Sequence, residues 1–211
     1  MQIVALLFEG LTALDIVGPY EVLQRIPGAE VRFVARETGP VRTDNGHLAL
    51  HADSTLAETV AADILVVPGG FATRELEHDA EVLDWIRRLH ETTTWTTSVC
   101  TGSMLLAAAG LLDGLAATTH WMQLERLAEY GATPTSERVV EQGKIITAAG
   151  VSSGIDMALV LVERIMGAAV AQAIQLSIEY DPQPPFDAGS PVKAGPEIVD
   201  LVRAAAASGA R

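Results

Sequence analysis

Residues 96–110 read TTSVCTGSMLLAAAG, where a run of β-branched and small residues passes directly into a run rich in alanine and leucine. The first run predicts a buried strand and the second predicts a helix, so the chain turns from strand to helix near Cys100. Cys100 is the only cysteine of the sequence. The junction therefore either packs a small apolar residue in the core or presents a thiol.

The residues around Cys100 favour presentation of the thiol. Ser98 and Gly102 are small and lie two positions to either side, which is the spacing of a nucleophile elbow, because its tight turn excludes larger side chains. The residue at the apex of such a turn has a strained backbone and projects into a cleft. We also expect the N-terminus of the following helix to stabilise the thiolate and so to lower the pKa of Cys100.

The rest of the chain alternates between predicted strands and helices. Short apolar runs at 2–8 and 62–70 are typical of strands that are buried on both faces. The full set of predicted elements comprises strands at 2–8, 30–35, 62–70, 92–100 and 115–121, hairpins at 41–52 (turning at Asn45-Gly46) and 136–150 (turning at Gly143), helices at 12–26, 74–90, 101–112, 122–131, 152–167 and 168–180, a proline-rich connection at 180–191, and a last amphipathic helix. This order predicts one α/β domain over 1–211, flavodoxin-like, with a mostly parallel sheet flanked by helices on both faces.

Composition narrows the class of protein. Hydrophobic residues make up 49% of the 211 residues, which is typical of a globular chain, and the net charge of −13 argues against binding to nucleic acid. The N-terminus MQIVALLFEG lacks the basic segment of a signal peptide, and no apolar run reaches the roughly 18 residues that a membrane span needs. A single cysteine forms no internal disulfide, which fits a reducing compartment. We expect a cytoplasmic protein with neither a nucleic-acid nor a membrane partner.

Ligands of open α/β sheets bind at the carboxyl ends of the strands. Three strand ends carry candidate residues: Phe8-Glu9-Gly10, Pro68-Gly69-Gly70 and Val99-Cys100-Thr101. The N–H of Gly70 could pair with that of Thr101 to stabilise negative charge, or the two glycines could form a plain turn.

Asp15 allows two interpretations. Thr12 and Asp15 have the spacing of a capping box, in which Asp15 would cap a helix. Alternatively Asp15 faces the thiol as an acid, and Glu9 is a second candidate for this role.

The histidines give weaker signals. His120 ends a predicted strand and either reaches the cleft as a base or caps that strand, and no acid follows it in a His-x-Glu pattern. His47 and His51 share a strand face, but nothing near them in the sequence supplies a third ligand, so we expect no metal site.

Taken together, five motifs resemble the ThiJ/PfpI superfamily of the class I glutamine amidotransferase-like fold. They are GLTALDIVGPYEVL (10–23), ILVVPGG (64–70), SVCTGSMLLAAAGLLDG (98–114), ATTHW (117–121) and GVSSGIDMAL (150–159). The resemblance extends from about residue 2 to residue 180. Two branches share the pattern, namely isonitrile-hydrating enzymes and the sensor portion of AraC-type transcription regulators, and the end of the chain at Arg211 favours the enzyme branch.

The resemblance implies roles for individual residues. Cys100 would be the nucleophile and Asp15 the acid facing it, where much of the superfamily has glutamate, while Thr101 matches the residue that follows the cysteine. Gly70 would offer a backbone N–H, and the turn Ser153-Gly154-Ile155 would lie beside the thiol. Threonine at 101 in place of histidine argues against peptidase activity, and the lack of a His-x-Glu pattern argues against glutaminase activity.

The resemblance also implies an activity and an assembly. The expected reaction is the addition of water to an isonitrile through a cysteine thioimidate, by a cofactor-independent hydro-lyase that forms a homodimer. Two alternatives remain: a glyoxalase or deglycase acting on 2-oxoaldehydes, and a non-enzymatic ligand or oxidative-stress sensor based on Cys100.

Overall fold

A computed structural model describes residues 1–208 of the chain. The chain divides into two compact units, Met1–Ile178 and Glu179–Arg211. The first unit holds the sheet and every candidate site residue, and the second holds two helices. The expectation of a single domain over the whole chain stays a prediction.

The first unit is built on a seven-stranded sheet in the order β10-β11-β7-β6-β1-β2-β5. The pairings are parallel throughout, except for the antiparallel pair β10–β11 at one edge. Its strands are β1 (Gln2–Leu6), β2 (Glu30–Ala35), β5 (Ser54–Thr55), β6 (Ile64–Val67), β7 (Trp95–Val99), β10 (Val139–Gln142) and β11 (Ile145–Ala148). The order β2-β1-β6-β7-β11 is flavodoxin-like, and the strand order reverses at β1, which is where such folds bind ligands. The predicted mostly parallel α/β fold is confirmed.

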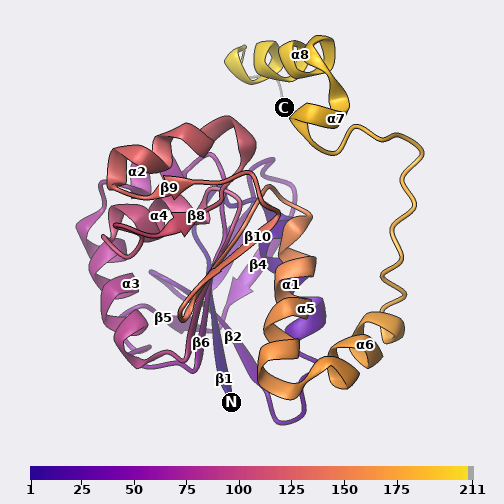
Figure 1. The fold of residues 1–211 in the computed structure, drawn as a ribbon. Coiled ribbons are helices and arrows are strands. Elements are labelled where there is room, and N and C mark those ends of the chain that lie inside the picture. Colours follow the sequence, from indigo (N-terminus) through magenta and orange to yellow (C-terminus); the bar gives the residue numbers. More distant parts are fainter. Residues whose placement is uncertain (209–211) are drawn as a thin grey trace. The chain divides into compact units, whose positions relative to one another are not determined.

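Helices cover both faces of this sheet (Figure 1). One face carries α1 (Ala13–Leu23) and α5 (Ser153–Met166), which pack on each other, with α6 (Ala168–Ser177) beside α5. The other face carries α3 (Ala80–Thr92) and α4 (Gly102–Ala108), and the short helix α2 (Thr73–Leu76) packs on α4. Each face has its own apolar core, because the central strands are buried on both sides and send alternate side chains into each core.

Both predicted hairpins form. Strands β3 (Gly39–Arg42) and β4 (Ala49–Ala52) pair antiparallel around the Asn45-Gly46 turn, outside the main sheet. Strands β10 and β11 turn at Gly143, whose φ of 61° lies in the left-handed region.

Three predicted elements differ in the structure. The helix expected at 74–90 is split into α2 and α3, because the Asp79 side chain accepts the N–H of Val82 and starts a new helix there. The strand expected at 115–121 is reduced to β8 (Ala116–Ala117), which pairs with β9 (Thr133–Pro134) in a separate small sheet. The helix expected at 122–131 is a 3-10 helix, η1 (Trp121–Tyr130).

The second unit contains α7 (Pro191–Ala194) and α8 (Pro196–Ala207). Each begins at a proline, a residue that suits the first helical turn, and Gly195 lies between the two helices. Within residues 1–208, no helix combines the length and the apolar character that a membrane crossing requires.

Candidate functional site

Cys100 sits at the sharp turn that joins β7 to α4. Its φ of 56° is in the left-handed region, which a residue with a side chain adopts only at a cost of about 1–3 kcal/mol. Hydrogen bonds from the Cys100 N–H to the carbonyls of Ala148 and Ala149, at 3.1 and 3.0 Å, hold this backbone in place. The turn therefore has the geometry of a nucleophile elbow.

The small residues around the elbow are required by close packing. A Cβ on Gly102 would collide with the Val67 carbonyl and lie 2.7 Å from that of Pro68. A Cβ on Gly69 would lie 2.5 Å from the Thr101 nitrogen. The end of β6 is thus pressed against the first turn of α4, and only glycine fits at either contact.

Asp15 lies in the first turn of α1 and is completely buried. Its Oδ2 accepts the Gly69 N–H at 2.8 Å, and Oδ1 has no nitrogen or oxygen partner within residues 1–208. In a capping box, the side chains of Thr12 and Asp15 would both bond backbone N–H groups at the start of α1. The Thr12 hydroxyl instead donates to Asp44, and neither oxygen of Asp15 bonds the backbone of α1. The capping interpretation of Asp15 is therefore wrong.

Burial raises the pKa of Asp15 from its usual 3.8 to about 7. The Gly69 N–H and the Cys100 thiol both donate to the carboxylate and lower this pKa, while the negative charge of Asp44 raises it. The thiol thus faces the carboxyl directly. Near neutral pH the carboxyl holds a proton in a large fraction of the molecules, so it can act as an acid.

Burial also raises the pKa of Cys100 to about 12, and the negative charge of Asp15 raises it further. The N–H groups of Val151 and Thr101 and the Thr101 hydroxyl act in the opposite direction. The sequence-based expectation of a lowered thiol pKa is wrong, because desolvation by burial outweighs the hydrogen bonds that Thr101 and Val151 donate to the sulfur. At neutral pH the site holds a thiol beside a carboxyl.

Thr101 ties the elbow to the neighbouring strand end. Its hydroxyl accepts the Gly70 N–H at 3.0 Å and lies 3.2 Å from the Gly70 carbonyl. The Gly70 N–H therefore donates to the Thr101 hydroxyl. The sequence suggested that this N–H acts together with the Thr101 N–H to stabilise negative charge, and the structure does not show that arrangement. A part for Gly70 in substrate binding stays a prediction.

The backbone N–H groups of Thr101 and Val151 both donate to the Cys100 sulfur. Val151 was not identified from the sequence. Val151 has a φ of 30° and lies between the end of β11 and the start of α5. A β-branched residue rarely adopts positive φ, so no sequence pattern points to this conformation. The nearest signal is Gly150, whose position leaves no room for a Cβ beside the ring of His120.

The Ser153-Gly154-Ile155 turn forms the first turn of α5, next to the elbow. The Ser153 hydroxyl donates to the Ala149 carbonyl at 2.5 Å, and Ala149 in turn accepts the Cys100 N–H. A Cβ on Gly154 would lie 3.0 Å from Val99, the residue before the thiol, and Ile155 contacts Gly18 of α1. These residues hold the backbone next to Cys100 in place, and their contact with substrate stays a prediction.

His120 stands at the start of η1. Its ring packs on Gly150, its Nδ1 lies 3.4 Å from the Met122 nitrogen, and burial lowers its pKa, which favours the neutral imidazole. The preceding residue, Thr119, donates its hydroxyl to the Cys100 carbonyl at 2.9 Å. The structure thus brings His120 to the neighbourhood of the elbow, and its contact with substrate stays a prediction.

Glu9 and the two paired histidines lie elsewhere. Glu9 accepts the Arg42 N–H and lines a separate cavity whose walls include neither Asp15 nor Cys100. His47 and His51 are exposed on the β3–β4 hairpin. In the described part of the chain, no three histidine, cysteine or acidic residues come together in a way that could hold a metal ion.

Comparison with known proteins identifies the relatives of this chain. The model of the DJ-1/PfpI family matches residues 1–164. The isonitrile hydratase of Pseudomonas putida is 42% identical over 207 residues, which cover 98% of this chain and 90% of that protein. The HTH-type transcriptional regulator CdhR of Pseudomonas aeruginosa is 30% identical and aligns with 83% of this chain but only 53% of its own length. The crystal structure of a ThiJ/PfpI family protein from Pseudomonas syringae superposes with a TM-score of 0.92 at 38% identity, covering 97% of this chain and 86% of that one.

Proposed function

The chain belongs to the DJ-1/PfpI family, and from that premise we propose that it is an isonitrile hydratase, which adds water to an isonitrile to give an N-substituted formamide. The observation that carries the proposal is the buried pair of Asp15 and Cys100, a carboxyl with a pKa of about 7 facing a thiol at an elbow. Similarity to the hydratase of Pseudomonas putida over nearly the whole chain supports the same reaction.

The pair suits the first half of the reaction. The terminal carbon of an isonitrile, R–N≡C, accepts the proton of the Asp15 carboxyl and becomes electrophilic. The Cys100 sulfur then attacks this carbon, and the thiol proton moves to the Asp15 carboxylate that has just formed. The product is a thioimidate, R–N=CH–S–Cys100, with Asp15 protonated again.

This order of steps accounts for the raised pKa of the thiol. A free thiolate is never needed, because the sulfur loses its proton only after the neighbouring carboxylate appears. The buried site therefore holds no net charge before the substrate is protonated, which keeps the desolvation cost low.

The second half of the reaction releases the product. Water adds to the thioimidate carbon, and the nitrogen gains a proton, so the intermediate is R–NH–CH(OH)–S–Cys100. The C–S bond then breaks, the sulfur regains a proton, and R–NH–CHO leaves. Asp15 passes these protons, and the N–H groups of Thr101 and Val151 stabilise charge that develops beside the sulfur.

The Thr101 hydroxyl has a positioning part in this proposal. Its bonds with Gly70 keep the end of β6 against the elbow, so the Gly69 N–H stays on Asp15. We also propose that the reaction needs no cofactor and takes place in the cytoplasm.

We include a homodimer in the proposal. Leu176 of α6 is 76% exposed and Met166 at the end of α5 is 40% exposed, so the first unit leaves apolar surface for a second copy to cover. Light scattering at micromolar concentration should give twice the chain mass of 22.3 kDa, and a monomer alone would contradict this part of the proposal.

Incubation with cyclohexyl isocyanide tests the proposed activity. The wild-type protein should form N-cyclohexylformamide, and Cys100→Ser should form none above the uncatalysed rate. Methylglyoxal, assayed in parallel, examines the 2-oxoaldehyde alternative. Turnover of methylglyoxal without formamide would replace the proposal, and a stable Cys100 sulfinate at low peroxide without turnover of either substrate would favour a sensor.

A further inference from the structure

The first strand leads to a second site. Phe8 and Glu9, which follow β1, line a cavity of about 550 Å³ at the carboxyl end of β1 and β2. Its remaining walls come from the loop after β2, from β3 and from helices α2 and α3. A volume in this range is typical of pockets that hold small organic ligands.

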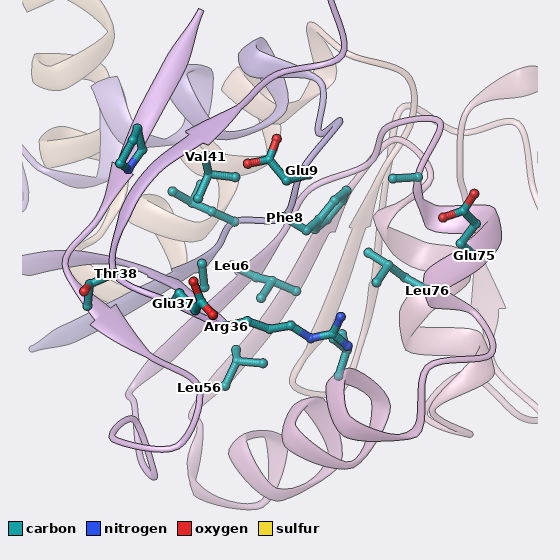
Figure 2. A pocket seen from close by; sticks show the side chains of 15 residues that line it. Leu6, Phe8, Glu9, Arg36, Glu37, Thr38, Val41, Leu56, Glu75 and Leu76 are labelled. Atoms are coloured by element: carbon teal, nitrogen blue, oxygen red, sulfur yellow. The ribbon is translucent and has the colours of Figure 1, made fainter. Parts of the chain in front are cut away.

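The interior of the cavity is mostly apolar, with the Arg36 side chain running beside the leucines (Figure 2). Figure 2 shows Leu6, Phe8 and Leu76 together along it, and the lining also includes Val41 of β3 and Leu56, which follows β5. Leu6, Val41 and Leu56 are buried, so these side chains already have most of their surface removed from water. An apolar ligand body would cover the exposed parts of Phe8 and Leu76 and would itself leave water, and this burial would provide most of its binding energy.

The polar residues at the cavity carry mostly negative charge. Glu9, Glu37 and Glu75 are exposed and come from three different segments around it (Figure 2). Arg36 is the one cation among the lining residues, and its guanidinium is already paired with Asp79 and with Glu81, the latter at 3.0 Å. The potential at the opening is therefore negative, which attracts cations and repels carboxylates and phosphates.

The cavity is separate from the thiol site. A backbone bridge between Leu11 and Gly70 lies between the two, and a Cβ on Gly10 would contact Ala72 at 3.4 Å, so the segments after β1 and β6 pack against each other there. Glu9 lines the cavity, whereas Asp15, Cys100 and Thr101 are not among its lining residues. A ligand in the cavity would not touch Cys100.

We propose that this cavity is a second binding site, for a small organic cation that carries a protonated amine on an apolar body. The hydrocarbon part lies among Leu6, Phe8 and Leu76, and the ammonium group lies at the opening, in the negative potential of the surrounding glutamates. In this proposal Glu9 helps to bind the cation, whereas it has no part in the reaction at Cys100.

Isothermal titration calorimetry with three benzyl compounds tests this proposal. Benzylammonium should bind at least about fivefold more tightly than benzyl alcohol at low salt, since each of two or three exposed carboxylates adds a small attraction, and benzoate should bind least. Equal affinities for the three compounds would show that the carboxylates do not select the ligand and would overturn the proposal.

Variants locate the ligand. Thr38→Trp places a large side chain at an exposed lining position and should abolish binding of benzylammonium. The double variant Glu37→Gln, Glu75→Gln should remove most of the preference for the ammonium over the alcohol. The matched control Glu125→Gln, Glu137→Gln changes net charge equally at exposed positions of the first unit that do not line the cavity, and it should keep that preference.

The thiol site is excluded with Cys100→Ser, in which binding should be unchanged. Loss of benzylammonium binding in Cys100→Ser, or unchanged binding in Thr38→Trp, would place the ligand elsewhere and contradict the proposal. These measurements are independent of isonitrile turnover, so the second site and the proposed function can fail separately.

Discussion

Oδ2 of Asp15 accepts the N–H of Gly69 at 2.8 Å, and this bond joins the first turn of α1 to the end of β6. The two residues are 54 positions apart in the sequence. Because Gly69 also packs on the Thr101 nitrogen, the same contact sets the distance between the carboxyl and the elbow that carries Cys100. The proposed acid and the proposed nucleophile are thus held where the segments that follow β1, β6 and β7 meet.

The pH dependence of the proposed activity follows from Asp15. The reaction requires a protonated carboxyl, so kcat/KM should be level below about pH 7 and fall above it, because the pKa of Asp15 is about 7. Asp44 raises this pKa by its negative charge. In Asp44→Asn the pKa of Asp15 falls, and the decline of kcat/KM should therefore begin at a lower pH.

The control for this profile is Asp113→Asn, an exposed acid away from the site, which should leave the decline where it is in the wild-type enzyme. Rates are measured on cyclohexyl isocyanide, with the uncatalysed acid hydrolysis subtracted at each pH. A shift toward higher pH in Asp44→Asn would contradict the assignment of this limb to Asp15.

Asp15 should also impose a pH-dependent cost on stability. A carboxyl with a raised pKa binds its proton more tightly in the folded state, so the free energy of unfolding should fall as pH rises from about 4 to about 7 and then level off. The loss attributable to Asp15 is up to roughly 4 kcal/mol. Asp15→Asn cannot ionise, so it should lack this decline and be more stable than the wild type at pH 8.

Urea unfolding at pH 4, 6 and 8 measures the effect. The difference in stability between Asp15→Asn and the wild type should grow in favour of the variant as pH rises. A constant difference across the three values would mean that the folded protein does not raise the pKa of Asp15.

The close contact behind the elbow gives a prediction about Gly102. An added methyl group would press on the carbonyls of Val67 and Pro68, which are backbone atoms with little freedom to move. Gly102→Ala should therefore lower the free energy of unfolding by at least about 2 kcal/mol. Gly189→Ala is the matched control, since nothing lies within 4 Å of its Cβ and its φ is outside the left-handed region, and it should have little effect. Equal stability of the two variants would mean that β6 and α4 are less tightly packed than described.

Much of the fold could be predicted from the sequence because its signals are local. The buried strands are short apolar runs, and the two hairpin turns need positive φ at Gly46 and Gly143, which glycine adopts readily. The break between α2 and α3 was missed because helical periodicity continues through it. Only the bond from the Asp79 side chain to Val82 reveals a new helix start.

The candidate site was predictable only in part. Ser98 and Gly102 identify the elbow, since the spacing of small residues is visible in the sequence. The use of the Gly70 N–H by Thr101, the effect of Asp44 on Asp15, and the amide of Val151 depend on contacts between distant segments. The direction of the thiol pKa was wrong for the same reason, since burial is a property of the packed molecule.

The most direct test of the account is the rate of N-cyclohexylformamide formation by Asp15→Asn and Asp15→Glu, compared with the wild-type protein. Asn cannot donate the proton, so turnover should fall by roughly 10²-fold or more, whereas Glu keeps the acid one methylene away and should retain partial activity. Melting temperatures measured alongside ensure that the variants are folded. Formamide formation by Asp15→Asn at the wild-type rate would remove Asp15 from the mechanism and contradict the account.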